Sequence, residues 1–248
     1  KAGVAIVCCL LPLVIGFVLP LSRLAYWAGL TVTKVLDMSF LKLTLNSIGI
    51  SIAAGITTVL LALFLAYTAK YFGSRMVRAT NRLAILGYAV PGAVIAMGIL
   101  LLTKQLNSAT GWVITGSLTM LLLAYIIRFL AVAWHPIDSG MEQNCEQLNN
   151  ASRSLGASPA HSLIQINMPL LCNSLVAAGL FVFVDTMKEL PLTLILRPFN
   201  FETLSTKTFD LAKQAQIPES SVSALCIIIV SLLPVVWRGA EGGRADCG

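Results

Sequence analysis

The chain has 248 residues, of which 57% are hydrophobic and only 11% are charged, whereas a typical soluble domain carries about 25% charged residues. The mean hydropathy is +0.84. The charges are clumped, so that whole stretches of about 20 residues carry none, which is long enough to cross a bilayer core of roughly 30 Å. This composition argues against a cytosolic enzyme, a secreted disulfide scaffold and a disordered protein, and it indicates an integral membrane protein.

The net charge and the cysteines point to no other class. A net charge of +6 does not indicate a nucleic-acid partner, because Lys and Arg gather in the cytoplasmic loops of membrane proteins. Four of the six cysteines lie inside apolar runs, and the sequence has no C-x-x-C or His-rich metal spacing. We therefore expect the cysteines to fill space among apolar side chains.

Six apolar runs are long enough to be transmembrane helices, which predicts an all-α membrane bundle. In chain order they cover 3–21, 44–69, 83–103, 112–134, 166–184 and 221–237. The first run lacks the small-residue cleavage site of a secretory signal and is long for one, so we interpret it as a spanning helix. Pro12, Pro91 and Pro234 lie inside these runs and predict kinks.

The orientation is predicted mainly from one basic loop. Between the second and third helices the sequence carries Lys70, Arg75, Arg78 and Arg82. Because positive charge favours the cytoplasmic side, this loop is predicted to be cytoplasmic. Alternation of the helices then puts both termini and the long segment 135–165 in the cytoplasm.

The most informative segment is the polar stretch 138–171, which is too polar to enter lipid. Asp138 is a candidate N-cap of a first helix, and Gly156 can end that helix in the left-handed conformation. Ser158 and Pro159 then fit the N-cap and the first position of a second short helix. The segment is predicted to form a helix, a glycine turn and a helix along the membrane's inner face.

The predicted tip of this segment is apolar. It exposes Ala151, Leu155 and Ala157, and an apolar tip on a cytosolic loop needs a partner to cover it. An ordinary amphipathic helix lying in the membrane interface is the alternative.

The same stretch resembles the cytoplasmic loop motif of ABC importer permeases, in which E-A-A is followed by three residues, Gly, nine residues and I-x-L-P. The matching residues are Ala151 and Ser152 at the two Ala positions, Gly156 at the Gly position, and Ile166, Met168 and Pro169 at the I-x-L-P positions. Asn150 stands where the motif has Glu, which removes an acidic side chain from the expected contact with the ATPase.

Other stretches agree with this resemblance. Asn46 and Ser47 resemble the start of the permease core, and 87–92 resembles the third helix of iron(III)- and thiamine-type permeases. The segment 185–212 resembles ferric-iron permeases, in which K-E-L-P and L-R-P-F-N-F recur. Those permeases are commonly fusions of two halves, and this chain resembles the second half. Because the chain begins at Lys1, we expect a piece of a longer protein or a processed product.

The resemblance implies a type I ABC importer permease with six transmembrane helices and a cytoplasmic coupling-helix loop. Its permease domain would cover 1–237, with a core at about 40–237 preceded by an extra transmembrane helix at 3–21. Residues 238–248 are expected to form an unstructured tail. The protein would lie in the cell inner (plasma) membrane, and its ATPase-coupling residues would be Asn150, Ala151, Ser152, Leu155, Gly156, Ala157 and Pro159.

The resemblance also implies partners and a cargo. ATP and Mg would be bound by separate cytosolic ATPase subunits, and the sequence contains no Walker-A motif. The chain itself is expected to be no enzyme and to bind no cofactor. The other expected partners are a periplasmic binding protein, a second permease half or a homodimer mate, and membrane lipid, but no nucleic acid. Ferric iron is the expected cargo. The alternatives are another solute (thiamine, a phosphonate or a polyamine) and an ATP-independent channel or secondary transporter.

Charged residues interrupt the apolar sequence after the fifth helix. Asp185, Lys188 and Glu189 share one helix side, and Pro191 cannot continue the helix's hydrogen bonds. These residues and Arg197 are candidates for the substrate pathway, because charges at membrane depth require a wet cavity or a protein interior. The two carboxylates suit a hard cation, whereas the basic side chains suit an anion or an acidic face of a binding protein. An internal Asp185–Lys188 ion pair that touches no substrate is the alternative.

Three further polar residues are expected to have no role in a site. Arg128 lies in an apolar context, and we expect it near the inner end of the fourth helix or snorkelling there. His135 and His161 have no second ligand at metal spacing, so both are expected to be surface residues.

Overall fold

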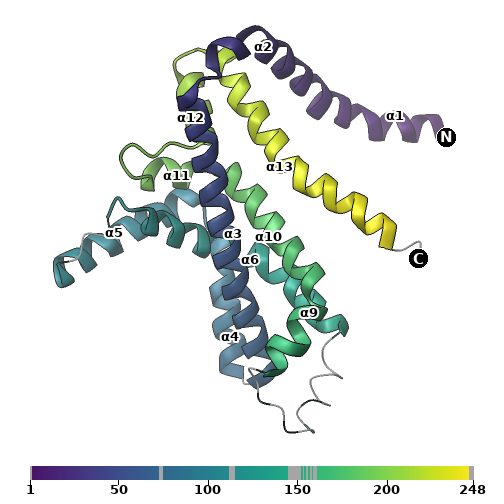
Figure 1. Ribbon diagram of the computed structural model, residues 1–248, viewed down its shortest axis with the longest axis vertical. Coiled ribbons are helices and arrows are strands. Elements are labelled where there is room, and N and C mark those ends of the chain that lie inside the picture. The colour runs from purple at the N-terminus through teal and green to yellow at the C-terminus, as the bar shows by residue number, and fades with distance from the viewer. Residues whose placement is uncertain are drawn as a thin grey trace. The chain divides into compact units, whose positions relative to one another are not determined.

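The computed structural model contains helices, and no strand, in the residues that it describes: 2–72, 75–111, 115–144, 152, 154, 156, 158 and 161–245. This confirms the expected all-α class. The chain forms two compact units, one of residues Lys1–Ser47 with Glu202–Gly248 and the other of Ile48–Phe201. Helix α3 (Met38–Phe72) begins in the first unit and continues into the second (Figure 1).

The first unit opens with a long helical stretch. Helix α1 (Ala2–Leu13), the π-helical turn η1 (Val14–Val18) and α2 (Leu19–Val35) follow one another directly. The stretch suited to crossing a membrane is Leu10–Val35, so it lies further along the chain than the predicted 3–21. Arg23 ends the apolar run without ending the helix, and its guanidinium lies 5.5 Å from the centre of a tryptophan ring.

Two adjacent polar residues hold the start of α12 (Leu204–Lys213). The Asn46 side chain donates a hydrogen bond of 3.4 Å to the Glu202 carbonyl. The Ser47 hydroxyl accepts one of 2.7 Å from the Leu204 amide. Thr203 caps the same helix through a reciprocal capping box. Of the pair that resembles the start of the permease core, Ser47 thus supplies an acceptor for an amide at the helix N-terminus, which would otherwise lack one, and Asn46 binds the carbonyl just before the helix.

The last helix, α13 (Ile217–Ala245), packs against α2, where the Thr31 hydroxyl donates a 2.9 Å hydrogen bond to the Pro218 carbonyl. It continues through 238–245, where the sequence predicts an unstructured tail. Extending an existing helix adds one hydrogen bond per ordered residue, so polar and glycine residues at its end do not stop it at once. Residues 246–248 lie outside the described part.

The second unit contains the remaining helices of the described residues. They are the rest of α3, α4 (Arg75–Ala84), the 3₁₀ turn η2 (Ile85–Ala89), α5 (Gly92–Thr110), α6 (Leu118–Asn144), the π-helical turn η3 (Ser162–Asn167), α9 (Met168–Leu170), α10 (Cys172–Met187) and α11 (Pro191–Leu196). Helices α6 and α10 run side by side (Figure 1). The core is built around α6, whose Tyr125 and Ile137 are almost completely buried.

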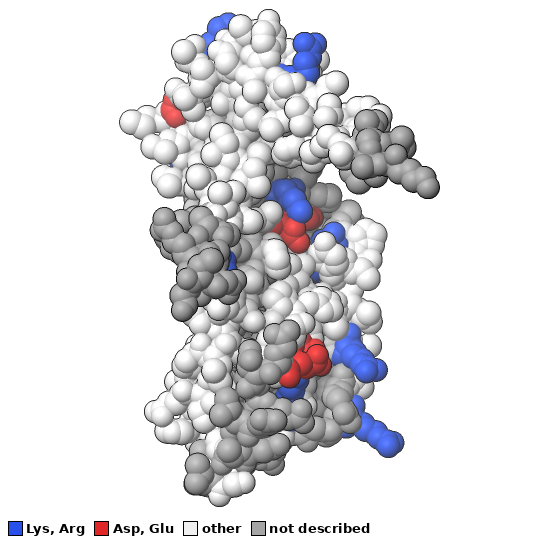
Figure 2. All heavy atoms as spheres, turned by 90° about the vertical axis from the view of Figure 1, so that its right-hand side faces the viewer, with Lys and Arg blue, Asp and Glu red and all other residues white. Residues whose placement is uncertain are grey.

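Four helices are long and apolar enough to cross a membrane, and two bent helix pairs bring the number to six if each pair is one span. The four are Leu10–Val35, Met38–Tyr71, Leu118–Glu142 and Ile217–Val236. The bent pairs are Asn81–Ala89 with Gly92–Ser108, at 119°, and Ser162–Leu170 with Cys172–Met187, at 73°. The six predicted spans therefore all have counterparts, but the third and fifth are sharply broken. On the face drawn in Figure 2, the charged side chains of the described residues lie in small groups with uncharged areas between them, as expected where helices contact lipid.

The Asp138 N-cap predicted from the sequence is wrong. Helix α6 runs on to Asn144, so Asp138 lies inside it and not at a helix start. Its carboxylate lies 3.9 Å from the Lys70 ammonium, which also approaches Glu142 at 3.9 Å. The buried side chains of Ile137 and Met141 continue the apolar face of α6 past Pro136, which explains why the helix does not end there.

A tight contact between α6 and α10 gives a test of this packing. A Cβ atom at Gly140 would lie 3.0 Å from both Leu171 Cδ2 and Ser174 Cβ, so Gly140→Val should lower the free energy of unfolding by about 1–3 kcal/mol. Thermal unfolding in detergent, followed by circular dichroism, would measure it. Gly98→Val is the matched control, because Gly98 is exposed on α5 and no described atom beyond its own helix backbone lies within 4 Å of its added Cβ. Equal losses in both variants would contradict the packing.

Candidate functional site

Two helix breaks in the second unit create the site. The first lies at Val90 and Pro91, where Val90 is extended with φ −84° and ψ 134°, as expected for a residue that precedes proline. The second lies between α10 and α11, where Pro191 occupies the first turn of α11. A break inside a membrane protein exposes backbone polar groups, which need partners because lipid offers none.

Arg128 supplies a partner at the first break. It lies in the middle of α6, and its guanidinium donates a hydrogen bond to the Val90 carbonyl. The same guanidinium lies 5.7 Å from the centre of the Tyr88 ring, within cation–π range. The expectation that Arg128 lies near the inner end of its helix is therefore wrong. Because the Arg128 guanidinium contacts a carbonyl and an aromatic ring inside the unit, it does not have to extend to the membrane–water interface.

Glu189 supplies a partner at the second break and meets the same arginine. Its Oε2 lies 3.7 Å from Arg128 Nε, and the two side chains are only 11% and 18% exposed. Its Oε1 accepts a hydrogen bond of 3.4 Å from the Leu192 amide at the start of α11. The Arg128–Glu189 pair therefore joins the two helix breaks. We call Arg128, Glu189, Tyr88, Val90 and Gly92 the Arg128–Glu189 cluster.

A glycine allows this close approach. Gly92 is the first residue of α5, and a Cβ atom there would lie 2.7 Å from Glu189 Oε1 and 3.5 Å from Arg128 Nε. Any other residue would push the carboxylate away from its present position, because nonbonded carbon and oxygen atoms do not approach so closely. Gly92 thus sets how near the two breaks come to each other.

A second polar contact secures α11. The Tyr125 hydroxyl on α6 and the Thr193 hydroxyl are 2.5 Å apart, and both side chains are buried. Thr193 also donates a 2.8 Å hydrogen bond to the Glu189 carbonyl. The break after α10 is therefore held from α6 by one ion pair and one hydrogen bond.

The predicted pathway residues around this break divide into two groups. Asp185 and Lys188 form an ion pair of 2.7 Å, with Asp185 17% and Lys188 64% exposed, as in the alternative raised from the sequence. Glu189 points instead to Arg128. Pro191 begins α11, and Arg197 follows its last residue. Among the described residues, no three His, Cys, Asp or Glu side chains lie close enough together to hold a metal ion.

The predicted coupling loop is described at four positions between 150 and 160. Gly156 has φ +78°, the left-handed conformation predicted for it. The Ser158 hydroxyl accepts a 3.3 Å hydrogen bond from the His161 amide, which confirms it as an N-cap. Ser152 is buried, and its hydroxyl lies 2.8 Å from that of Ser162. The other predicted coupling residues lie outside the described part: Asn150, Ala151, Leu155, Ala157 and Pro159.

Comparison with known proteins decides the family. The sequence model of the family described as "Binding-protein-dependent transport system inner membrane component" matches residues 58–238. The chain belongs to this family. It is thus a permease subunit of an ABC importer, a membrane transport component and not an enzyme.

Two relatives illustrate the range of cargoes. The permease is 29% identical to the Haemophilus influenzae "Fe(3+)-transport system permease protein FbpB 2", over 87% of this chain and 42% of that protein. It therefore spans less than half of that relative's length. It is 25% identical to the H. influenzae "Spermidine/putrescine transport system permease protein PotC", over 75% of this chain and 74% of that protein.

A solved structure supports the fold. The permease superposes with a TM-score of 0.74 on a chain of a bacterial ABC transporter involved in the import of the acidic polysaccharide alginate. The match covers 98% of this chain and 95% of that one at 12% sequence identity. The likeness extends to the type I importer permease fold expected from the sequence.

Sequence reasoning missed the aromatic and hydroxyl residues of this permease's site. Tyr125 and Thr193 carry no motif, so no sequence signal marked them, and Tyr88 was marked only as part of the segment 87–92. Arg128 did carry a signal, because an ionisable residue within a membrane span is by default a candidate for function.

Proposed function

We propose that this permease forms one half of the translocation pathway of a ferric-iron importer. Paired with a second permease half or a second copy, it would form the pathway for ferric iron delivered by a periplasmic binding protein. The observation that carries the cargo is the similarity to a ferric permease over 87% of the chain. That stretch includes the K-E-L-P segment, which contributes Glu189.

The Arg128–Glu189 cluster is the proposed gate of this pathway. It is a nearly buried ion pair between two broken spans, and a charged pair in such a place requires a protein interior or a wet cavity. Carboxylate oxygens such as those of Glu189 and Asp185 suit a hard ferric ion, and the nearby cations suit an anion travelling with it. Alternating access would part the pair in one state and close it in the other.

The coupling loop is the proposed connection to the energy source. Its turn at Gly156 would sit in a groove on a cytosolic ATPase subunit, where ATP and Mg are bound. ATP can shift the permease between two states only if it binds them differently, so the loop must stay docked while the ATPase subunits close and open. This proposal requires the loop and both termini to be cytoplasmic, as the basic residues between α3 and η2 favour.

Uptake of radiolabelled iron tests the cargo. The complex of this permease with its ATPase and binding protein would be reconstituted in vesicles and supplied with ⁵⁵Fe(III), with and without internal ATP. We expect iron accumulation that needs ATP and is absent when the binding protein is omitted. Accumulation of another solute in place of iron would refute ferric iron as the cargo, and iron uptake without ATP would refute the importer mechanism.

A second cargo is favoured by one specific similarity. A protein of Salmonella paratyphi A named as a 2-aminoethylphosphonate transport system permease, PhnV, is 24% identical over 76% of this chain and 70% of its own length. Its cargo carries an anionic phosphonate, which the basic side chains near the helix breaks suit. The same vesicles supplied with radiolabelled 2-aminoethylphosphonate would distinguish the two cargoes.

A further inference from the structure

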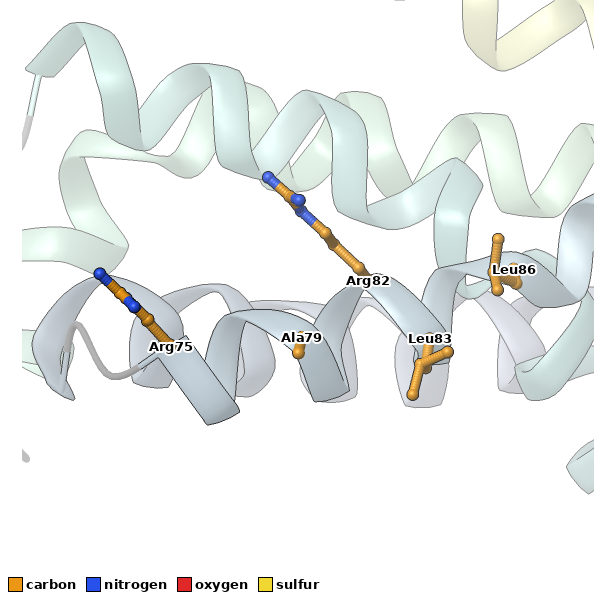
Figure 3. Close-up of a pocket in the computed structure, with 5 residues that line it drawn as sticks. All are labelled: Arg75, Ala79, Arg82, Leu83 and Leu86. Carbon is orange, nitrogen blue, oxygen red and sulfur yellow. The ribbon is translucent and has the colours of Figure 1, made fainter.

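An open hollow of about 580 Å³ runs along α4 and η2. It is lined by Arg75, Ala79, Arg82, Leu83 and Leu86, and Figure 3 shows Arg75, Arg82 and Leu86 extending to the same side of the ribbon. All five side chains are exposed, with Leu83 at 68% and Leu86 at 54%. The hollow shares no residue with the Arg128–Glu189 cluster or the coupling loop.

The charge in the hollow is of one sign. Arg75 and Arg82 are two helical turns apart, roughly 10 Å along the axis, and none of the described lining residues is acidic. Neither arginine forms an ion pair with any residue that the structure describes. Two guanidinium groups with donors to spare favour an anion, and their planar forks fit phosphate oxygens in particular.

The hollow also changes from polar to apolar along its length. The arginines lie on α4, whereas Leu83 and Leu86 follow at its end and in η2. Arg82, Leu83 and Leu86 all lie in the first arm of the bent span Asn81–Ala89 with Gly92–Ser108, so the hollow covers the start of an apolar segment, with Arg75 just before it. A soluble anion would leave both leucines uncovered. An amphiphile with a phosphate head and an acyl chain would satisfy both ends.

We infer that this hollow binds one anionic phospholipid. Its phosphodiester lies between Arg75 and Arg82, and one acyl chain lies along Leu83 and Leu86. The bound lipid holds α4 beside the sharp bend at Pro91. This inference concerns lipid and does not depend on which solute the permease carries.

Native mass spectrometry of the purified, delipidated full chain tests the inference. The protein would be titrated with dioleoylphosphatidylglycerol and, separately, with glycerol 3-phosphate and with the zwitterionic analogue dioleoylphosphatidylcholine, whose quaternary ammonium cancels the charge of its phosphodiester. Because each basic residue near a membrane surface contributes about 1 kcal/mol to anionic-lipid binding, R75Q/R82Q should bind phosphatidylglycerol roughly 30-fold more weakly. Binding of phosphatidylcholine should stay weak and unchanged.

The matched control is K34Q/K104Q, which removes the same charge from α2 and α5, outside the hollow. This variant should keep wild-type binding of phosphatidylglycerol, and an unchanged unfolding temperature would show that each variant is folded. Equal weakening in both double variants would overturn the inference in favour of general charge attraction. Binding of glycerol 3-phosphate as tight as that of the lipid would overturn it in favour of a soluble anion, and undiminished binding by R75Q/R82Q would overturn it outright.

Discussion

Replacing Gly156 with valine is expected to lower ATP-driven transport at least tenfold while the ATPase subunits remain bound. The backbone at Gly156 has φ +78°, a conformation that costs an L-residue about 1–2 kcal/mol and a β-branched residue more. The backbone strain of a valine at this position could be relieved only by a change in the conformation of the turn, which we propose docks on the ATPase. About 1.4 kcal/mol changes an equilibrium constant tenfold, so the strain alone suffices to make the present conformation of the turn a minor one.

The surroundings of this glycine separate the effect of backbone strain from that of a steric clash. Within the described part of the chain, no atom outside its neighbours lies within 4 Å of a Cβ built at Gly156, so the expected effect of valine comes from backbone strain. Gly156→Asn is the matched control, because asparagine tolerates the left-handed conformation and should retain most transport. Co-purification of the ATPase, ATP hydrolysis and solute uptake would be measured in parallel. Wild-type uptake by Gly156→Val with the ATPase bound would refute the coupling role.

Local chemistry explains why this turn was predictable. The left-handed conformation of Gly156 and the cap by Ser158 depend on residues within one helical turn, and the sequence alone indicates both. The extent of α6 depends instead on distant packing partners. Its continuation past Asp138 is stabilised by burial of Ile137 and Met141 among other helices, which no local pattern reveals.

The membrane spans were predictable in number but not in shape. Apolar length is a property of the sequence, and all six runs have counterparts in the structure. Three of the prolines predict kinks equally, yet Pro12 and Pro234 lie inside continuous helices whereas Pro91 separates two helices at 119°. The difference lies in the neighbours. At Pro91 the Val90 carbonyl, which the helix break leaves without a helical partner, accepts a hydrogen bond from Arg128. This contact stabilises the break.

The pairing of Arg128 with Glu189 could not be predicted for a related reason. Each residue stands out as a charge in an apolar context, and Glu189 was a candidate pathway residue from the sequence. Their meeting depends on how α6, α5 and the break after α10 pack, together with the space left by Gly92. The sequence therefore indicated that these charges lie in a protein interior, whereas only the structure shows that Arg128 and Glu189 pair with each other.

Replacing Glu189 with glutamine is expected to have the largest effect on both stability and transport. It would leave the Arg128 guanidinium, only 18% exposed, without its counter-charge, and breaking a buried ion pair by removing one partner costs about 3–5 kcal/mol. We expect a clearly lower unfolding temperature in detergent and a loss of transport of more than tenfold. Lys188→Gln is the matched control, because Lys188 is 64% exposed in its pair with Asp185 and should change stability by less than about 1 kcal/mol.

A double variant separates a structural role of this pair from a role in the pathway. Replacing a buried ion pair by apolar residues of similar size is often neutral or stabilising, whereas the Val90 carbonyl and the Leu192 amide would lose their side-chain partners. Arg128→Met with Glu189→Met should therefore recover part of the lost unfolding temperature. If the pair is the gate for a charged cargo, transport will stay low in this double variant, because neither charge is left to contact the cargo. The ion pair that would part and re-form in alternating access is also gone. If transport returns together with stability, the pair serves only to hold the two helix breaks together.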